Sequence, residues 1–201
     1  MKITISPWFW GLALLLATAA TRSPISVAFW VVVVLISVLI HELGHALSAM
    51  MWGQKVQIEL TAFGGVTTRQ GAPLSPLQDF FIIAMGPTFG FLFALLIYCI
   101  AQYVPQMVYG WLYLIVEINV IWSLLNLLPV HPLDGGKLMA IILGMFFGNS
   151  GKRFSYFSSA IIAILFAFLM IVYSNPIVGA LFLLFSFESF RAWKDASLRK
   201  K

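Results

Sequence analysis

The sequence predicts an all-α polytopic membrane protein with about six transmembrane helices, and three observations favour this fold class. The 201 residues are 61% hydrophobic and only 9% charged, whereas a soluble domain is about a quarter charged. The mean hydropathy is +0.97. Long runs without a charged residue recur along the chain, as is typical of membrane-spanning helices. The length fits a single integral membrane domain, 1–201, with no room for a sizeable soluble module.

Six apolar segments are the candidate spans. They are 3–21, 25–51, 80–103, a fourth that begins near Trp111 and is interrupted by "NLLPVHPLDGG", 154–173 and 177–190. The first, at about 1.5 Å per residue, only just crosses the hydrocarbon core. Its basic start, apolar middle and Ala17-x-Ala19 end also resemble a signal peptide. We favour a retained helix because Lys2 is the single basic residue at its start.

The segment between the second and third spans has a residue pattern that is typical of strands and turns and not of a spanning helix. "VQIEL" alternates in part, and Gly64 with Gly65 can turn the chain, so residues 54–70 predict a short re-entrant loop resembling a β-hairpin. Residues 144–201 are expected to form two C-terminal helices and a basic tail.

The basic residues predict the orientation in the membrane. With a cytosolic N-terminus and six alternating spans, the outer side holds Arg22 alone of the twelve Lys and Arg residues. Positive charge gathers on the cytosolic side of membrane proteins, so both termini are expected in the cytosol. The net charge of +5 is then explained by membrane-flanking residues, and no nucleic acid partner is expected.

The second span ends in "HELGH", which is unusual for a segment surrounded by lipid. His41 and His45 are four residues apart, so on a helix they share a face, and Glu42 lies beside that face. H-E-x-x-H on a helix is a zinc metalloprotease signature. An ionisable residue at the bilayer centre costs about 2.5–3.5 kcal/mol on insertion scales, and a zinc ion would compensate three of them. One Zn²⁺ per chain is therefore expected.

A catalytic zinc usually has a third protein ligand, and the apolar body offers few candidates. They are Glu117, His131, Asp134 and Glu188. Asp134 lies in "PVHPLDGGKL", where prolines stop regular helix and two glycines allow close backbone approach. Irregular backbone at membrane depth is tolerated where it is buried or lines a wet cavity, and an aspartate there can point at a metal.

Together, "HELGH" and "NLLPVHPLDGGKL" resemble the site-two protease family of intramembrane zinc metalloproteases. Three further features are similar to that family. They are Phe63-Gly64-Gly65 in the hairpin segment, Gly86-Pro87 in the third span and Asn126 before the proline-rich run. The resemblance covers roughly residues 25–143, the family's three-helix catalytic core.

The resemblance implies a set of roles. His41, His45 and Asp134 would ligate zinc toward the cytosolic side, and Glu42 would be the general base. Asn126 would help to hold the substrate or the developing oxyanion, and the glycine-containing loop at Gly64 and Gly65 would lie near the substrate. The implied activity is hydrolysis of peptide bonds in or near the transmembrane segment of membrane-anchored proteins or signal-peptide remnants, within the lipid bilayer.

The sequence also departs from the family pattern. Gly90 stands where the family often has asparagine, and His131 stands where a small or apolar residue is usual. We expect a local hydrogen-bonding role for His131, with substrate contact as the alternative. The chain has no room for a PDZ insert or a C-terminal nucleotide-sensing CBS module, so it resembles a minimal bacterial-type member.

Three points stay open at the level of sequence. A membrane ion or metal transporter could use the same polar residues in a broken helix, and an inactive relative could act as a binding partner. Glu117 is expected to form a hydrogen bond between helices, or else to line a proton or water path. Because a membrane helix hides its carbonyls, the substrate must be extended, and "VQIELTAFGG" could pair with it as an edge strand.

Overall fold

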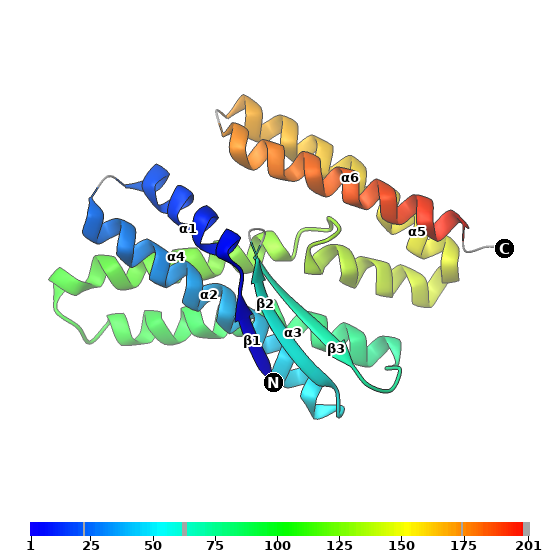
Figure 1. Cartoon of the computed structure of the whole chain (residues 1–201), viewed down its shortest axis with the longest axis horizontal. Helices are drawn as coiled ribbons and strands as arrows, with labels where there is room; N and C mark the ends of the chain where they lie inside the picture. The colour runs from blue at the N-terminus through cyan, green and yellow to red at the C-terminus, as the bar shows by residue number, and fades with distance from the viewer. Residues whose placement is uncertain (22, 62–63, 174, 199–201) are drawn as a thin grey trace. The chain divides into compact units, whose positions relative to one another are not determined.

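The structure is a computed structural model that describes residues 1–21, 23–61, 64–173 and 175–198. Arg22, Phe63 and the basic tail residues 199–201, which the sequence analysis singled out, lie outside the described residues. The described helices are α1 (Pro7–Ala20), α2 (Pro24–Met51), α3 (Pro76–Ala101), α4 (Gln106–Asn126), α5 (Asp134–Val172) and α6 (Pro176–Leu198). The strands are β1 (Lys2–Ile5), β2 (Lys55–Thr61) and β3 (Gly64–Gln70) (Figure 1).

Five of the described helices are long and apolar enough to cross a membrane, one fewer than predicted. The difference lies in the segment 3–21, which does not form one helix. Residues Lys2–Ile5 form β1, and α1 has only 14 residues, or about 21 Å against a hydrocarbon core of about 30 Å. Ser6 accepts a hydrogen bond from the Trp8 backbone N–H at the start of α1, and Pro7 opens the helix. This Ser-Pro pair is a helix-start signal.

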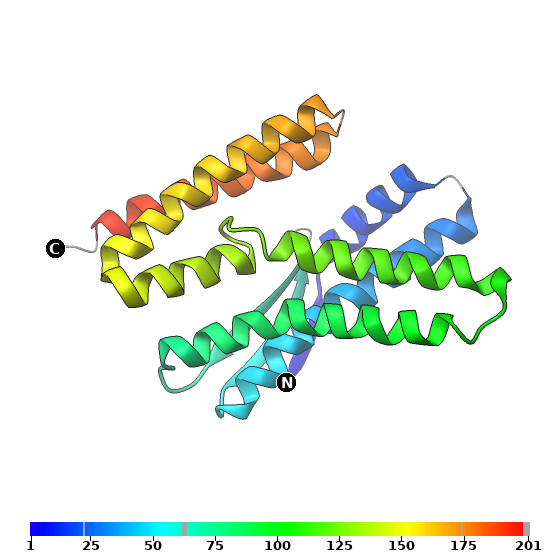
Figure 2. The same ribbon diagram turned by 180° about the vertical axis from the view of Figure 1, so that it is seen from behind.

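The predicted fourth and fifth spans also differ from the observed helices. α4 is 21 residues long and complete before the connection 127–133. α5 begins at Asp134 and continues to Val172, with non-helical dihedral angles at Gly148 (φ 59°, ψ −140°). The segment predicted as the fifth span, 154–173, is therefore the part of α5 that follows this sharp turn (Figure 2).

The fold is mostly helical, as predicted, and it also contains a small three-stranded sheet in the order β1-β2-β3. β1 pairs in parallel with β2, and β2 pairs antiparallel with β3. Side chains of β2 alternate between exposed and buried, with Val56, Ile58 and Leu60 on the buried face. The segment 54–70, expected to resemble a hairpin, thus supplies two strands, and the N-terminal strand adds a third that the sequence did not predict.

The chain divides into two compact units. The first contains residues 1–74 and 84–124. In this unit α1 lies beside α2, and β2 and β3 pack against α2. Asn119 of α4 donates a hydrogen bond of 2.9 Å to the Ser37 hydroxyl of α2, and both side chains are buried. This bond joins the two helices one turn before His41.

The second unit contains residues 75–83 and 125–201. In this unit α5 and α6 lie side by side (Figures 1 and 2). Its core includes Val130 from the connection before α5, Ala163 and Ala167 from α5, and Phe182 and Phe185 from α6. The connection is therefore anchored by packing between the two helices.

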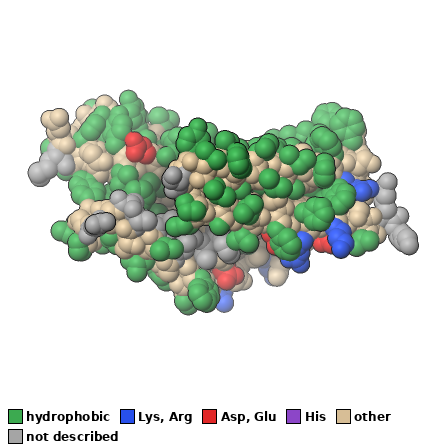
Figure 3. All heavy atoms as spheres, turned by 90° about the horizontal axis from the view of Figure 1, so that it is seen from above, with side chains coloured by type: hydrophobic (Ala, Val, Ile, Leu, Met, Phe, Trp, Pro, Cys, Tyr) green, Lys and Arg blue, Asp and Glu red, His purple; other side chains and the backbone are tan. Residues whose placement is uncertain are grey.

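The outer faces of the helices are largely apolar. Phe168 of α5 and Phe187 of α6 are 63% and 59% exposed, and most of the face in Figure 3 is hydrophobic, with few charged side chains. Such a continuous apolar exterior is unusual for a soluble protein. It is the surface expected of a protein surrounded by lipid.

Candidate active site

The side chains of the two histidines of α2 approach each other closely. His41 and His45 are one turn apart and buried, and their Nε2 atoms are 3.2 Å apart. Two imidazole nitrogens bound tetrahedrally to one zinc ion at about 2.05 Å would lie about 3.3 Å from each other. The observed separation fits shared coordination of one metal ion, so the donor set on α2 is suited to zinc.

Glu42 completes a three-residue group with the histidines. One potential ligand atom from each of His41, Glu42 and His45 lies within 4.8 Å of the other two. Glu42 is only 5% exposed, and the Thr67 hydroxyl donates a hydrogen bond of 2.6 Å to its Oε2 atom. The sequence analysis did not single out Thr67. The available signal was its place two residues after Gly65, which puts both on the same face of a strand.

Two glycines make room for this group. A Cβ atom at Gly65 of β3 would collide with the side chain of Glu42. A Cβ atom at Gly86 of α3 would collide with the His45 imidazole and would lie 2.9 Å from Nε2 of His41. The glycine-containing loop and the Gly-Pro pair therefore have a direct steric role, since they allow a strand and a helix to approach the polar side chains closely.

Gly64 has a different environment from Gly65. Its φ angle is +116°, a conformation that side-chain-bearing residues rarely adopt, and a Cβ atom there would lie 3.3 Å from the Trp122 ring of α4. The two adjacent glycines thus serve separate purposes, one for backbone conformation and one for space beside Glu42.

Asp134 belongs to the second unit, where it is the first residue of α5. Its side chain is buried and pairs with Lys137 at 3.0 Å. A carboxylate is favoured at a helix N-terminus by the helix dipole. The next residue, Gly135, lies against the backbone carbonyls of Leu127 and Leu128, where a Cβ atom would collide. The first turn of α5 therefore packs in direct contact with the connection that precedes it.

Hydrogen bonds from two serine hydroxyl groups hold the connection 127–133 in place. Ser159 of α5 donates to the Pro129 carbonyl at 3.0 Å, and Ser189 of α6 donates to the His131 carbonyl at 2.7 Å. The hydrogen bond at His131 is thus made by its backbone carbonyl, and its ring meets Tyr156 edge-on with centroids 5.2 Å apart. These bonds fix irregular backbone that has no helical partners.

The ring of His131 lies outside the helices and is largely buried. Burial lowers its pKa below the ordinary value for histidine, and the positive charge of Lys137 acts in the same direction while Glu188 opposes it. Asn126, the other polar residue expected near the substrate, is the last residue of α4. It belongs to the same unit as His131.

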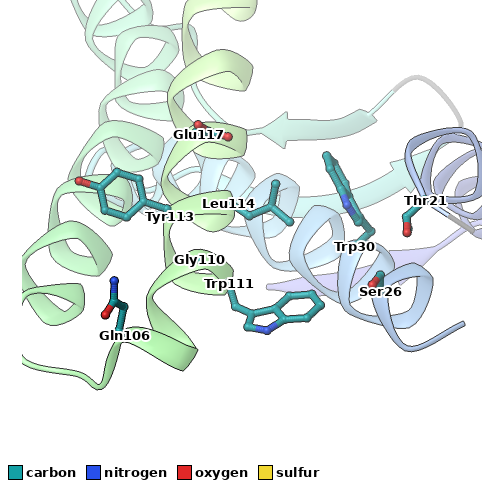
Figure 4. A pocket seen from close by; sticks show the side chains of 9 residues that line it. All are labelled: Thr21, Ser26, Trp30, Gln106, Gly110, Trp111, Tyr113, Leu114 and Glu117. Atoms are coloured by element: carbon teal, nitrogen blue, oxygen red, sulfur yellow. The ribbon is translucent and has the colours of Figure 1, made fainter. Parts of the chain in front are cut away.

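A cavity of about 520 Å³ lies in the first unit, lined by Thr21 after the end of α1 and by residues of α2 and α4 (Figure 4). Glu117, halfway along the apolar part of α4, is among the lining residues and is exposed. Its carboxylate forms no hydrogen bond with another of the described residues, and the hydrogen bond between helices is made by Asn119 instead. The sequence analysis overlooked Asn119.

Comparison with known proteins identifies the family. The family model of peptidase family M50 matches residues 29–111 and 101–172. The putative zinc metalloprotease Rip3 of Mycobacterium tuberculosis is 35% identical over 156 residues, which is 70% of this chain and 39% of Rip3. Stage IV sporulation protein FB of Bacillus subtilis is 30% identical over 147 residues, 71% of this chain and 48% of that protein.

A solved structure shares the fold. The site-2 protease from Methanocaldococcus jannaschii superposes with a TM-score of 0.67 at 24% identity, over 98% of this chain and 92% of that one. The chain spans about two fifths of the length of Rip3. The family model nevertheless covers the histidines of α2, strands β2 and β3 and the Asp134 region, and the chain therefore belongs to peptidase family M50.

Proposed function

We propose that this chain is a zinc-dependent intramembrane endopeptidase that hydrolyses peptide bonds within or near the transmembrane segment of membrane-anchored proteins. One observation carries the proposal. Two buried imidazole Nε2 atoms lie 3.2 Å apart beside a buried carboxylate, in an apolar helix long enough to cross a membrane. The names of relatives such as Rip3 support the same chemistry.

His41 and His45 would hold the zinc ion, and Asp134 would be the third protein ligand that catalytic zinc sites usually have. Asp134 suits this role because it is a buried carboxylate on a backbone held by hydrogen bonds. When bound, zinc supplies Lewis acidity that polarises a carbonyl and makes a water molecule more acidic.

Glu42 would act as the general base. Its carboxylate would take a proton from the attacking water and pass it to the leaving amine. Asn126, at the end of α4, would donate a hydrogen bond to the substrate or to the oxyanion as charge develops there. Replacement of Glu42 by Gln separates these roles, since it removes the base and leaves the histidines in place.

The substrate would bind as an extended strand along β3. The segment expected to pair with the substrate was "VQIELTAFGG". Its "VQIEL" part lies in β2, which is enclosed by β1 on one side and β3 on the other. Ile58 and Leu60 of β2 are fully buried. β3 is an edge strand, the site where a peptide can add to a sheet.

Disulfide cross-linking tests this arrangement. Cysteines at Val66 and Thr68, whose side chains are exposed on β3, are expected to cross-link to single cysteines near the cleavage site of a trapped substrate. Cysteines at Gln57 and Glu59 of β2, also exposed, serve as controls and are expected to cross-link at least about tenfold less. Equal cross-linking from both strands would contradict the β3 assignment.

The proposed orientation places both termini and the metal site toward the cytosol. Lys2 and Gln57 are partners in the parallel pairing of β1 with β2, so the start of α1 and the end of α2 lie at the same end of a helical hairpin. A membrane-impermeant thiol reagent applied to intact cells should then label Tyr103→Cys between α3 and α4, and should not label Gln70→Cys. Both variants carry Cys99→Ser, and the reverse labelling would overturn the orientation.

The test of the enzymatic proposal is Glu42→Gln in a bacterial host that co-expresses tagged single-span membrane proteins. Wild-type protein is expected to cleave at least one of them, which then becomes the reporter, and Glu42→Gln is expected to lose cleavage by at least about a hundredfold. Zinc content is expected to be unchanged. Glu59→Gln, an exposed residue of β2, is the matched control. Cleavage by Glu42→Gln at the wild-type rate would refute the mechanism.

The third ligand is tested by metal binding. Asp134→Asn is expected to weaken zinc affinity by at least about tenfold, because it removes the charge of a ligand. Asp195→Asn makes the same change on an exposed residue of α6 and should bind zinc as wild type does. Equal affinity in all three proteins would exclude Asp134 as a ligand.

A further inference from the structure

On the inner face of β3, Thr67 places a hydroxyl group opposite an apolar side chain of β2. Thr67 pairs with Ile58 across the antiparallel ladder, and Gly65 pairs with Leu60. Ile58 and Leu60 are fully buried, and residues two apart on a strand share a face. Thr67 and Gly65 therefore lie on the face of the sheet that packs against α2.

A hydroxyl on this face needs a partner, and Glu42 supplies it. The hydrogen bond from Thr67 Oγ1 to Glu42 Oε2 is 2.6 Å long, within the range of about 2.5–2.7 Å that is typical when a hydroxyl donates to a charged carboxylate. The same hydroxyl also lies 3.4 Å from the Glu42 carbonyl. Thr67 thus contacts both the side chain and the backbone of one residue of α2.

The two oxygens of Glu42 have different surroundings. Oε2 is bound by Thr67, whereas Oε1 lies over Gly65 and has no hydrogen-bond partner among the described residues. Because Gly65 has no side chain, the backbone of β3 lies directly against the Glu42 side chain. The sheet therefore holds one oxygen through Thr67 and leaves the other without a hydrogen-bond donor from the described residues.

We propose that Thr67 is the positioning residue of the general base, holding Glu42 by Oε2 so that Oε1 is the oxygen that receives the proton. This inference rests on the proposed function and deepens it. Thr67 itself exchanges no proton with water or substrate. It restricts rotation of the carboxylate, which keeps Oε1 in the orientation that proton transfer requires.

Three variants separate positioning from packing. Thr67→Val keeps the shape and removes the hydroxyl, and Thr67→Ser keeps the hydroxyl and removes the methyl group. Thr4→Val is the matched control, since Thr4 is a partly buried threonine of β1 whose hydroxyl donates to the Ile58 carbonyl at 3.4 Å. All three are compared with wild type for zinc content and for kcat and KM on the reporter.

Thr67→Val is expected to lower kcat about 10- to 100-fold, the effect typical of losing a partner that orients an active-site group, with KM within about twofold and zinc unchanged. Thr67→Ser should restore kcat to within about threefold of wild type, and Thr4→Val should match wild type. Wild-type kcat in Thr67→Val would overturn the proposal. So would equal losses in Thr67→Val and Thr67→Ser, which would indicate packing alone.

Infrared spectroscopy of the folded protein tests the hydrogen bond without any substrate. The carboxylate band of Glu42 is identified as the one that Glu42→Gln removes. It should shift in Thr67→Val and stay in place in Thr67→Ser. If wild type cleaves no reporter, the proposed function fails while this measurement still decides whether Thr67 holds Glu42, and an unshifted band in Thr67→Val would refute it.

Discussion

Gly86 of α3 lies so close to the His45 imidazole that a single methyl group could not be added between them. The same methyl group would approach Nε2 of His41 to 2.9 Å. One glycine on a neighbouring helix therefore sets the space for both imidazoles. The Gly-Pro pair at this position, recognised in the sequence only as a family feature, has a steric explanation in the metal site.

Gly86→Ala is expected to weaken zinc binding about 10- to 100-fold. The added methyl group would displace the histidine side chains, and disturbing the surroundings of metal ligands lowers metal affinity on this scale. The measurement is competition with a chromophoric chelator in detergent. Gly11→Ala is the control, since a Cβ atom at Gly11 of α1 would meet nothing within 4 Å. Wild-type zinc affinity in Gly86→Ala would show that the histidines can move without loss.

Gly65→Ala is expected to act on Glu42, the proposed base, and not on His41 and His45, the proposed metal ligands. Its methyl group would displace the Glu42 side chain, so cleavage of the reporter should fall at least about tenfold while zinc content stays at the wild-type level. Gly86→Ala is thus expected to affect zinc binding, whereas Gly65→Ala is expected to affect cleavage through Glu42. A Gly65→Ala protein that loses zinc along with activity would contradict this division.

The bond between Asn119 and Ser37 is expected to stabilise the packing of α4 on α2. A double-mutant cycle of Ser37→Ala and Asn119→Ala should give a coupling energy of about 0.6 kcal/mol and at most about 1.7 kcal/mol, the range found for hydrogen bonds between membrane helices. Unfolding in mixed detergent micelles provides the free energies. A coupling energy of zero would mean that both side chains find equivalent partners when the bond is removed.

The cavity beside Glu117 is expected to contain water. Its lining includes hydroxyl, amide and carboxylate groups, and polar cavities of sufficient size are hydrated. Glu117→Cys, in a Cys99→Ser background, should react with a small cationic, membrane-impermeant thiol reagent. Val32→Cys, an exposed position of α2 outside the cavity lining, should react at least about tenfold more slowly. Equal rates would show that Glu117 is not reached through water.

The sequence predicted the histidine-glutamate group because the signal is local. Residues four apart on a helix share a face whatever the rest of the chain does, so His41 and His45 could be placed before any tertiary structure was known. Thr67, in contrast, reaches Glu42 only through the register of β3 against β2 and the packing of the sheet on α2. The two-residue spacing from Gly65 places Thr67 on the same face of a strand, but it does not indicate which helix that face packs against.

The strand β1 was missed for a related reason. Four residues, Lys2–Ile5, precede an apolar run and were assigned to it, although Ser6 and Pro7 marked the helix start. Whether four residues form a strand depends on a partner, and here the partner is β2, more than fifty residues later in the chain. Tertiary context decides strand formation more than local propensity does.

The parallel pairing of Lys2 with Gln57 has a consequence for biosynthesis. The residues of β1 are made well before those of β2, and both α1 and α2 lie between them. β1 can therefore reach its place in the sheet only when the two intervening helices have been translated. Pairing at this sequence separation is slow compared with helix formation. The three-stranded sheet that packs on α2 is therefore completed late, after the helix that carries His41 and His45 has been synthesised.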